Sequence, residues 1–76
     1  NMKLYEVTNG YIGFGVVKVL AIAKDKETAV KLARQKFKEQ AKKQPRLYGE
    51  NYFNNLQAKC ICDNVNEEWV SEIQGE

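Results

Sequence analysis

The stretch VVKVLAIA at residues 16–23 constrains the fold most, because it is apolar on both faces of an extended chain. Its β-branched and aliphatic residues favour a strand, in which successive side chains point to opposite faces. One face would carry Val17, Val19, Ala21 and Ala23, and the other Val16, Leu20 and Ile22. Both faces of this strand therefore need cover from water.

Only one segment has the length and periodicity of a long helix. Asp25 is a favourable N-cap residue, and Pro45 ends the pattern that follows it, so we expect a helix up to Gln44. The apolar residues of this segment recur every three or four positions: Ala29, Val30, Ala33, Phe37 and Ala41. A single helix covers one face of a sheet, so the other face is expected to be covered either by the C-terminal segment WVSEI or by another chain.

The remaining segments complete an α+β fold. Residues 3–8 (KLYEVT) and 56–63 (LQAKCICD) have the composition or alternation of strands. Residues 46–55 are expected to form a loop or a short turn of helix, and residues 69–73 (WVSEI) a fourth edge strand or a tail. We therefore predict a ββαβ(β) order: one domain over residues 1–76, with a three- to four-stranded antiparallel sheet and one long helix on one face.

The glycine-rich stretch NGYIGFG at residues 9–15 is interpreted as a turn and not as a phosphate-binding loop. Its glycines are spaced G-x-x-G-x-G and lead into a strand, whereas the dinucleotide fingerprint G-x-G-x-x-G opens a helix. Asn9-Gly10 predicts the hairpin turn itself, and Gly13 and Gly15 suit a bulge.

The inventory of reactive side chains argues against an enzyme. The chain has no histidine, the usual general base and metal ligand near neutral pH, and Ser71 is its only serine. Glu67, Glu68 and Glu72 are interpreted as solvated acids of a turn-rich tail. We expect no catalytic residues, no metal site and no cofactor.

The pair Cys60 and Cys62 has two interpretations. Two thiols could form a redox pair or supply two soft metal ligands. At a spacing of two in a strand they share a face with Leu56 and Ala58, and free cysteine packs as a small hydrophobe, so we favour a role in the core. Unpaired thiols also suit a reducing compartment such as the cytoplasm.

Charge is separated along the chain. Residues 1–46 hold eleven basic residues against four acids, whereas residues 47–76 hold one against six. Lysines and arginines form one row on the predicted helix and just beyond it, followed by three aromatic residues: Lys31, Arg34, Lys38, Lys42, Arg46, Tyr48, Tyr52 and Phe53. Such a row is either a solvated helix face or a surface for a phosphate backbone and stacked bases.

The segments MKLYEVTNGY, DKETAVKLARQKF and YFNNLQAKCICD resemble small uncharacterised proteins of bacteriophages and prophages. The resemblance implies a cytoplasmic accessory protein in a bacterial host, of a kind that binds a larger host component. It transfers no catalytic residues. Asn1 precedes Met2 and is interpreted as a remnant of expression.

Two functional hypotheses follow. The first is a non-enzymatic protein-binding module that forms a homodimer through the open sheet face, with four hydrophobic contacts: Val16, Leu20, Ile22 and Trp69. The alternative is a nucleic-acid-binding protein that uses the basic row. No apolar run approaches the ~20 residues that span a bilayer, so no membrane partner is expected.

Overall fold

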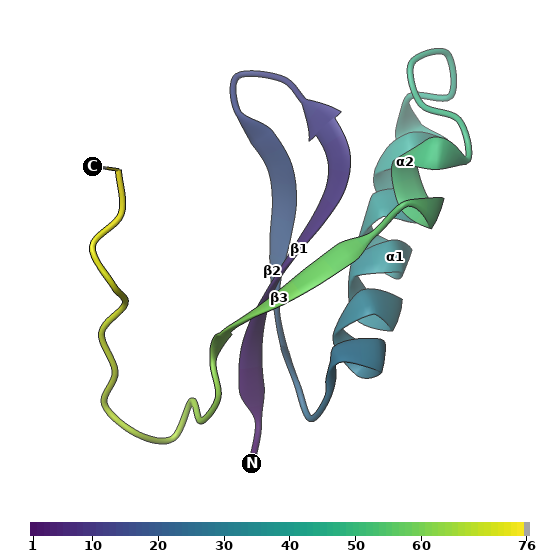
Figure 1. The fold of residues 1–76 in the computed structure, drawn as a ribbon. Helices are drawn as coiled ribbons and strands as arrows, with labels where there is room; N and C mark the ends of the chain where they lie inside the picture. Colours follow the sequence, from purple (N-terminus) through teal and green to yellow (C-terminus); the bar gives the residue numbers. More distant parts are fainter. Residues whose placement is uncertain (76) are drawn as a thin grey trace.

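The computed structural model describes residues 1–75 and shows a three-stranded antiparallel sheet with one long helix packed against it (Figure 1). Strand order is β2-β1-β3, so β1 is central and the other two strands form the edges. The elements are β1 (Lys3–Ile12), β2 (Val16–Ala23), α1 (Lys26–Lys43), α2 (Asn51–Asn54) and β3 (Gln57–Cys62). This is the α+β architecture predicted from the sequence.

The hairpin turn between β1 and β2 lies further along the chain than predicted. Asn9 and Gly10 lie inside β1, and the chain reverses at residues 13–15, where the Gly13 amide donates to the Gly15 carbonyl at 2.9 Å. The β1–β2 register shifts between Thr8 and Ile12, and Gly10 has a φ of 84°. The prediction of a turn at Asn9-Gly10 was wrong because this glycine's positive φ serves a bulge in the strand.

Helix α1 begins and ends as predicted. The Thr28 amide donates to Asp25 Oδ1 at 2.8 Å, which caps the first turn. At the other end the Gln44 amide donates to the Ala41 carbonyl at 3.2 Å, and Pro45 follows. The buried face of α1 carries three alanines and one large side chain: Ala29, Ala33, Phe37 and Ala41.

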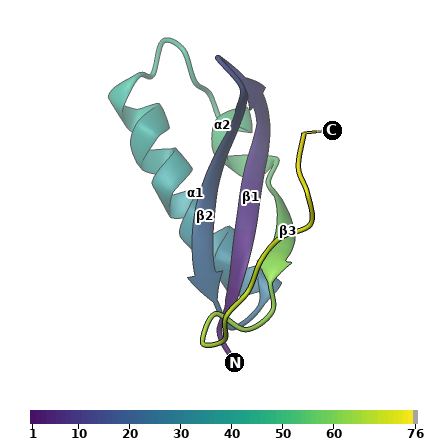
Figure 2. The same ribbon diagram turned by 90° about the vertical axis from the view of Figure 1, so that its left-hand side faces the viewer.

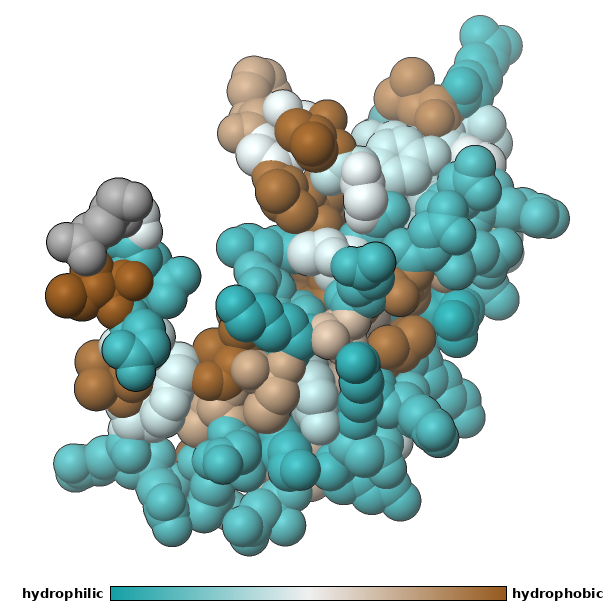
Figure 3. All heavy atoms as spheres, in the orientation of Figure 1, coloured by the Kyte–Doolittle hydropathy of each residue, from teal (hydrophilic) through white to brown (hydrophobic). Residues whose placement is uncertain are grey.

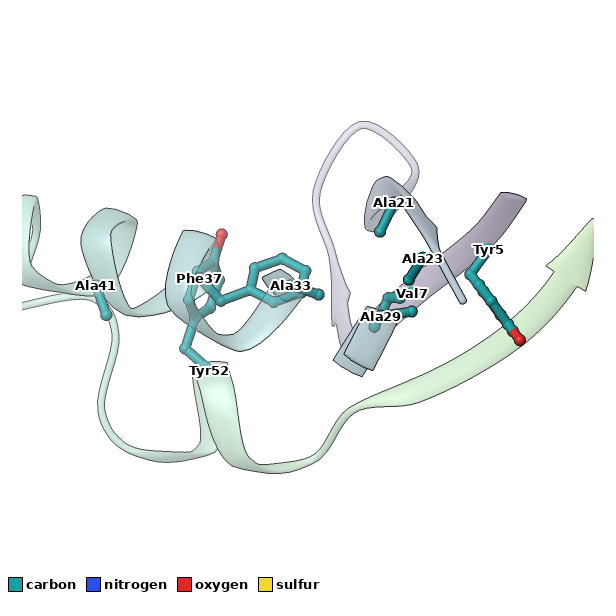
Figure 4. Close-up of a cluster of buried hydrophobic side chains, with 9 residues drawn as sticks. All are labelled: Tyr5, Val7, Ala21, Ala23, Ala29, Ala33, Phe37, Ala41 and Tyr52. Carbon is teal, nitrogen blue, oxygen red and sulfur yellow. The ribbon is translucent and has the colours of Figure 1, made fainter. Parts of the chain in front are cut away.

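The hydrophobic core lies between α1 and one face of the sheet (Figure 4). Small side chains on both layers let the helix approach the strands closely, and the aromatic rings fill the ends of the layer. Its buried members are Tyr5, Val7, Ala21, Ala23, Ala29, Ala33, Phe37, Ala41 and Tyr52. Val17 and Val19 pack against this cluster half-buried, so the predicted inward face of β2 is confirmed.

The C-terminal segment is a tail and not a fourth strand. Residues 63–75 form no helix or strand, and the Val65 amide donates to the Met2 carbonyl at 3.1 Å. Figures 1 and 2 show the tail running beside the sheet on the side away from α1. Neither helix within residues 1–75 has the length and apolar character needed to cross a membrane.

Candidate protein-binding face

The sheet face opposite α1 carries the row of hydrophobic side chains that the sequence predicted. Val16, Leu20 and Ile22 are 56%, 65% and 53% exposed. In this register Leu20 pairs with Glu6 and Ile22 with Leu4, on the central strand. The row therefore lies on the outer strand, on the face opposite α1, and neither helix found in residues 1–75 covers it (Figure 1).

The C-terminal tail stands over part of this face and leaves a hollow of about 570 Å³ beneath it. Leu20 from the sheet and Trp69 from the tail both line the hollow, whereas Val16 and Ile22 lie outside it. The structure therefore brings two of the four predicted contact residues together. Trp69 remains half exposed, so the tail does not seal the sheet.

Two charged side chains interrupt the apolar row. Lys18 Nζ lies 2.8 Å from Glu6 Oε1, and Lys18 stands on β2 between Val16 and Leu20. The ion pair is partly exposed, so we expect it to contribute little to stability. The ion pair does, however, place two charged groups within the otherwise apolar open face.

The tip of the β1–β2 hairpin is a hydrophobic surface that the sequence analysis missed. Phe14 is fully exposed, and Ile12 is paired with Val16 across the hairpin. Figure 3 shows hydrophobic residues at the hairpin tip and, separately, on the tail. The sequence does contain a signal for this surface, since Phe14 stands between two glycines. A phenylalanine at this place is exposed when the turn lies at residues 13–15.

The two cysteines occupy different environments. Cys60 is exposed and lines the hollow under the tail, whereas Cys62 is buried and its Sγ lies 3.3 Å from the Asn64 carbonyl oxygen. The β1–β3 register shifts between Leu4 and Tyr5, which pair with Cys62 and Cys60. The prediction that both cysteines pack in the core is wrong for Cys60, because this irregularity breaks the alternation of the strand.

The predicted basic row is partly engaged in packing. Arg34 Nε donates to the Phe53 carbonyl at 3.3 Å, and Lys38 Nζ lies 5.4 Å from the centroid of the Phe53 ring. These two side chains hold α2 beside α1. The other members, Lys31, Lys42 and Arg46, are exposed.

The aromatic residues beyond α1 form an internal cluster. Tyr48 stacks on Tyr52 with ring centroids 4.0 Å apart, and Tyr11 and Phe37 meet Tyr52 edge to face. Tyr52 is 5% exposed, and burial raises the pKa of its hydroxyl. Tyr52 therefore cannot stack on a nucleic-acid base as proposed, and Tyr48 offers at most one side of its ring.

Residues suited to metal binding or acid–base chemistry are dispersed. Across residues 1–75 no group of three or more cysteine or carboxylate side chains is arranged to hold a metal ion. Glu67, Glu68 and Glu72 are exposed. The apolar sheet face is therefore the most developed candidate site.

Comparison with known proteins found no match among protein-family models, curated proteins or solved structures.

Proposed function

We propose that the protein is a small non-enzymatic accessory protein that acts by protein–protein binding through its open sheet face, and that it forms a homodimer. In this proposal it is encoded by a phage or prophage and modulates a host component in the bacterial cytoplasm. The observation that carries the binding function is the exposure of Val16, Leu20 and Ile22 in one row. The phage setting rests only on the sequence resemblance.

The physical argument is the free energy of covering this row. Burying one large aliphatic side chain is worth about 1.5–3 kcal/mol, so the row offers a partner several kcal/mol before the entropic cost of association. Trp69 stands at the border of the same face and supplies an aromatic group of the type enriched in binding hot spots. A binding partner would therefore need an apolar surface about one strand long.

The test compares a triple variant, Val16→Ser with Leu20→Ser and Ile22→Ser, with the wild type and with the control Leu47→Ser. Leu47 is exposed but lies in the loop after α1. We expect the wild type to self-associate in sedimentation experiments and to bind an apolar dye, and the triple variant to lose the dye binding. A wild type that is monomeric at every concentration and binds no dye would refute the proposal.

Nucleic-acid binding remains a second candidate because Lys31, Lys42 and Arg46 are exposed and take no part in the ion pair found within residues 1–75. This function predicts affinity for single-stranded DNA or RNA that falls steeply with salt. The double variant Lys38→Glu with Lys42→Glu should abolish it, and Lys36→Glu with Lys43→Glu provides the same charge change on another part of α1. Equal binding by the wild type and by the variant Lys38→Glu with Lys42→Glu would show that the row is only a solvated surface.

A further inference from the structure

We propose that two copies of this chain join through the free edge of β2, with the two β2 strands antiparallel about a twofold axis perpendicular to the sheet. The inference rests on the proposed homodimer and specifies its geometry. It would turn two three-stranded sheets into one continuous six-stranded sheet, with both α1 helices on the same side.

The first observation is that the edge of β2 lacks the usual protection. β2 pairs with β1 on one side, and no strand within residues 1–75 pairs with its other side. Its eight residues include no proline and one charge, Lys18. The opposite edge strand, β3, is shorter and irregular at Cys60–Cys62. Natural proteins protect sheet edges with short strands, bulges, charges and proline, so a long apolar edge without them indicates a site for strand pairing.

The second observation is an apolar groove beside this edge, on the side of α1. The groove measures about 250 Å³ and is lined by Val19, Leu20, Ala21, Leu32, Ala33 and Lys36. Leu32 is 52% exposed although it lies on a core helix, at the border of this groove. Edge pairing would bring the two copies' Leu32 side chains toward each other and cover both.

The charges on the open face favour this edge geometry over stacking of two open faces. A face-to-face dimer would enclose the Glu6–Lys18 ion pair of each copy, together with Lys59, and would displace the tail. When an ion pair is buried, the free energy lost by removing its two charges from water exceeds the free energy of their mutual attraction, unless the geometry is favourable and further hydrogen bonds are made. Edge pairing leaves these groups in water and leaves Val16, Leu20 and Ile22 on a doubled surface for another protein.

A second copy suits the edge better than an unrelated extended peptide does. A twofold axis matches each β2 with an identical strand and continues both layers of the fold, sheet beside sheet and helix beside helix. A lone peptide would pair with the strand but would bring no helix to the exposed side of Leu32. The partner we infer is therefore another molecule of the same chain.

The experiment measures the dissociation constant of self-association by sedimentation for the wild type and three variants. Leu32→Glu should weaken self-association at least tenfold. Leu47→Glu makes the same change at an exposed leucine away from the edge, and Thr8→Arg places a charge on the open face of the central strand. Both variants should keep a dissociation constant within about twofold of the wild-type value. Loss of the dimer in Thr8→Arg but not in Leu32→Glu would establish face-to-face stacking and overturn the proposal.

Amide hydrogen exchange provides a second measurement on the unmodified protein. Alternate amides of β2 point away from β1, and edge pairing should slow their exchange at least tenfold as concentration rises through the dissociation constant. Exchange that is independent of concentration in a dimer overturns edge pairing. A wild type that stays monomeric at every concentration also overturns it. If the β2 amides of that monomer exchange slowly only after a peptide of residues 15–24 is added, the edge is a peptide-binding site instead. Dye binding by that monomer would leave the proposed function of the open face standing.

Discussion

The side chain of Asn9 in β1 binds the backbone of Tyr52 in α2, and so joins segments that lie 43 residues apart. Asn9 Nδ2 donates to the Tyr52 carbonyl at 2.9 Å, and Asn9 Oδ1 accepts from the Tyr11 amide at 3.1 Å. Asn9 is 2% exposed and is the one buried polar residue among those described. Its amide both stabilises the bulge in β1 and fixes α2 against the sheet.

Replacing Asn9 by alanine should lower the free energy of unfolding by about 1–3 kcal/mol, because the buried Tyr52 carbonyl and Tyr11 amide lose their partners. Chemical denaturation monitored by circular dichroism measures the change. Asn54→Ala, at an exposed position of α2, should stay within about 0.5 kcal/mol of the wild type. If the two variants were equally stable, the Asn9 hydrogen bonds would have no net effect.

Replacing Gly10 by alanine should destabilise the fold by about 1–2 kcal/mol, because its φ of 84° is unfavourable for a residue with a Cβ. The space around Gly10 is open, so the effect would come from the backbone alone. Gly13→Ala is the matched control, since Gly13 has open space but no positive φ. Thermal unfolding of the two variants should separate them, and equal melting temperatures would contradict the backbone argument.

The parts of the fold that were predicted from sequence are those fixed by local or periodic signals. Helix α1 has its N-cap at Asp25 and its end before Pro45, and both signals act within one turn of the helix. The position of the hairpin turn could not be found in this way. The dipeptide Asn9-Gly10 is compatible with either a turn or a bulge. In the structure the bulge occurs together with a hydrogen bond from Asn9 to Tyr52, and a contact between residues so distant in sequence cannot be found from local patterns.

The open face was predicted because alternation along β2 assigns its side chains to two sides, and the sequence contains only one segment with the pattern of a long helix. Cys60 and Tyr52 were misplaced for different reasons. An irregularity in the β1–β3 pairing moves Cys60 out of the core, and this depends on the partner strand. Tyr52 looked available in a loop sequence, but α2 turns its ring into a cluster with Tyr11 and Phe37.

The two thiols should differ sharply in reactivity. Under native conditions a thiol reagent should modify Cys60, which is exposed, and leave buried Cys62 unmodified until the protein unfolds. Mass spectrometry of the labelled protein before and after denaturation counts the modified groups. Cys60→Ser should remove the rapid reaction, whereas Cys62→Ser should retain it. Equal rapid labelling of both residues would contradict the buried position of Cys62.

The N-cap of α1 should make stability depend on pH in the acidic range. Hydrogen bonds from the side chain and the backbone amide of Thr28 lower the pKa of Asp25 below its usual 3.8. A group with a lowered pKa in the folded state stabilises the protein above its unfolded pKa, and this contribution disappears as pH falls through the folded value.

Asp25→Asn tests this effect because asparagine keeps the accepting oxygen of the cap without the charge. The wild type should melt at a higher temperature than Asp25→Asn at pH 7, and the difference should shrink as pH falls below about 4, near the unfolded pKa of aspartate. Asp25→Ala removes the acceptor as well and should melt below both proteins at pH 7. A difference between wild type and Asp25→Asn that stays constant from pH 7 to pH 2 would show that the charge of Asp25 does not stabilise the helix.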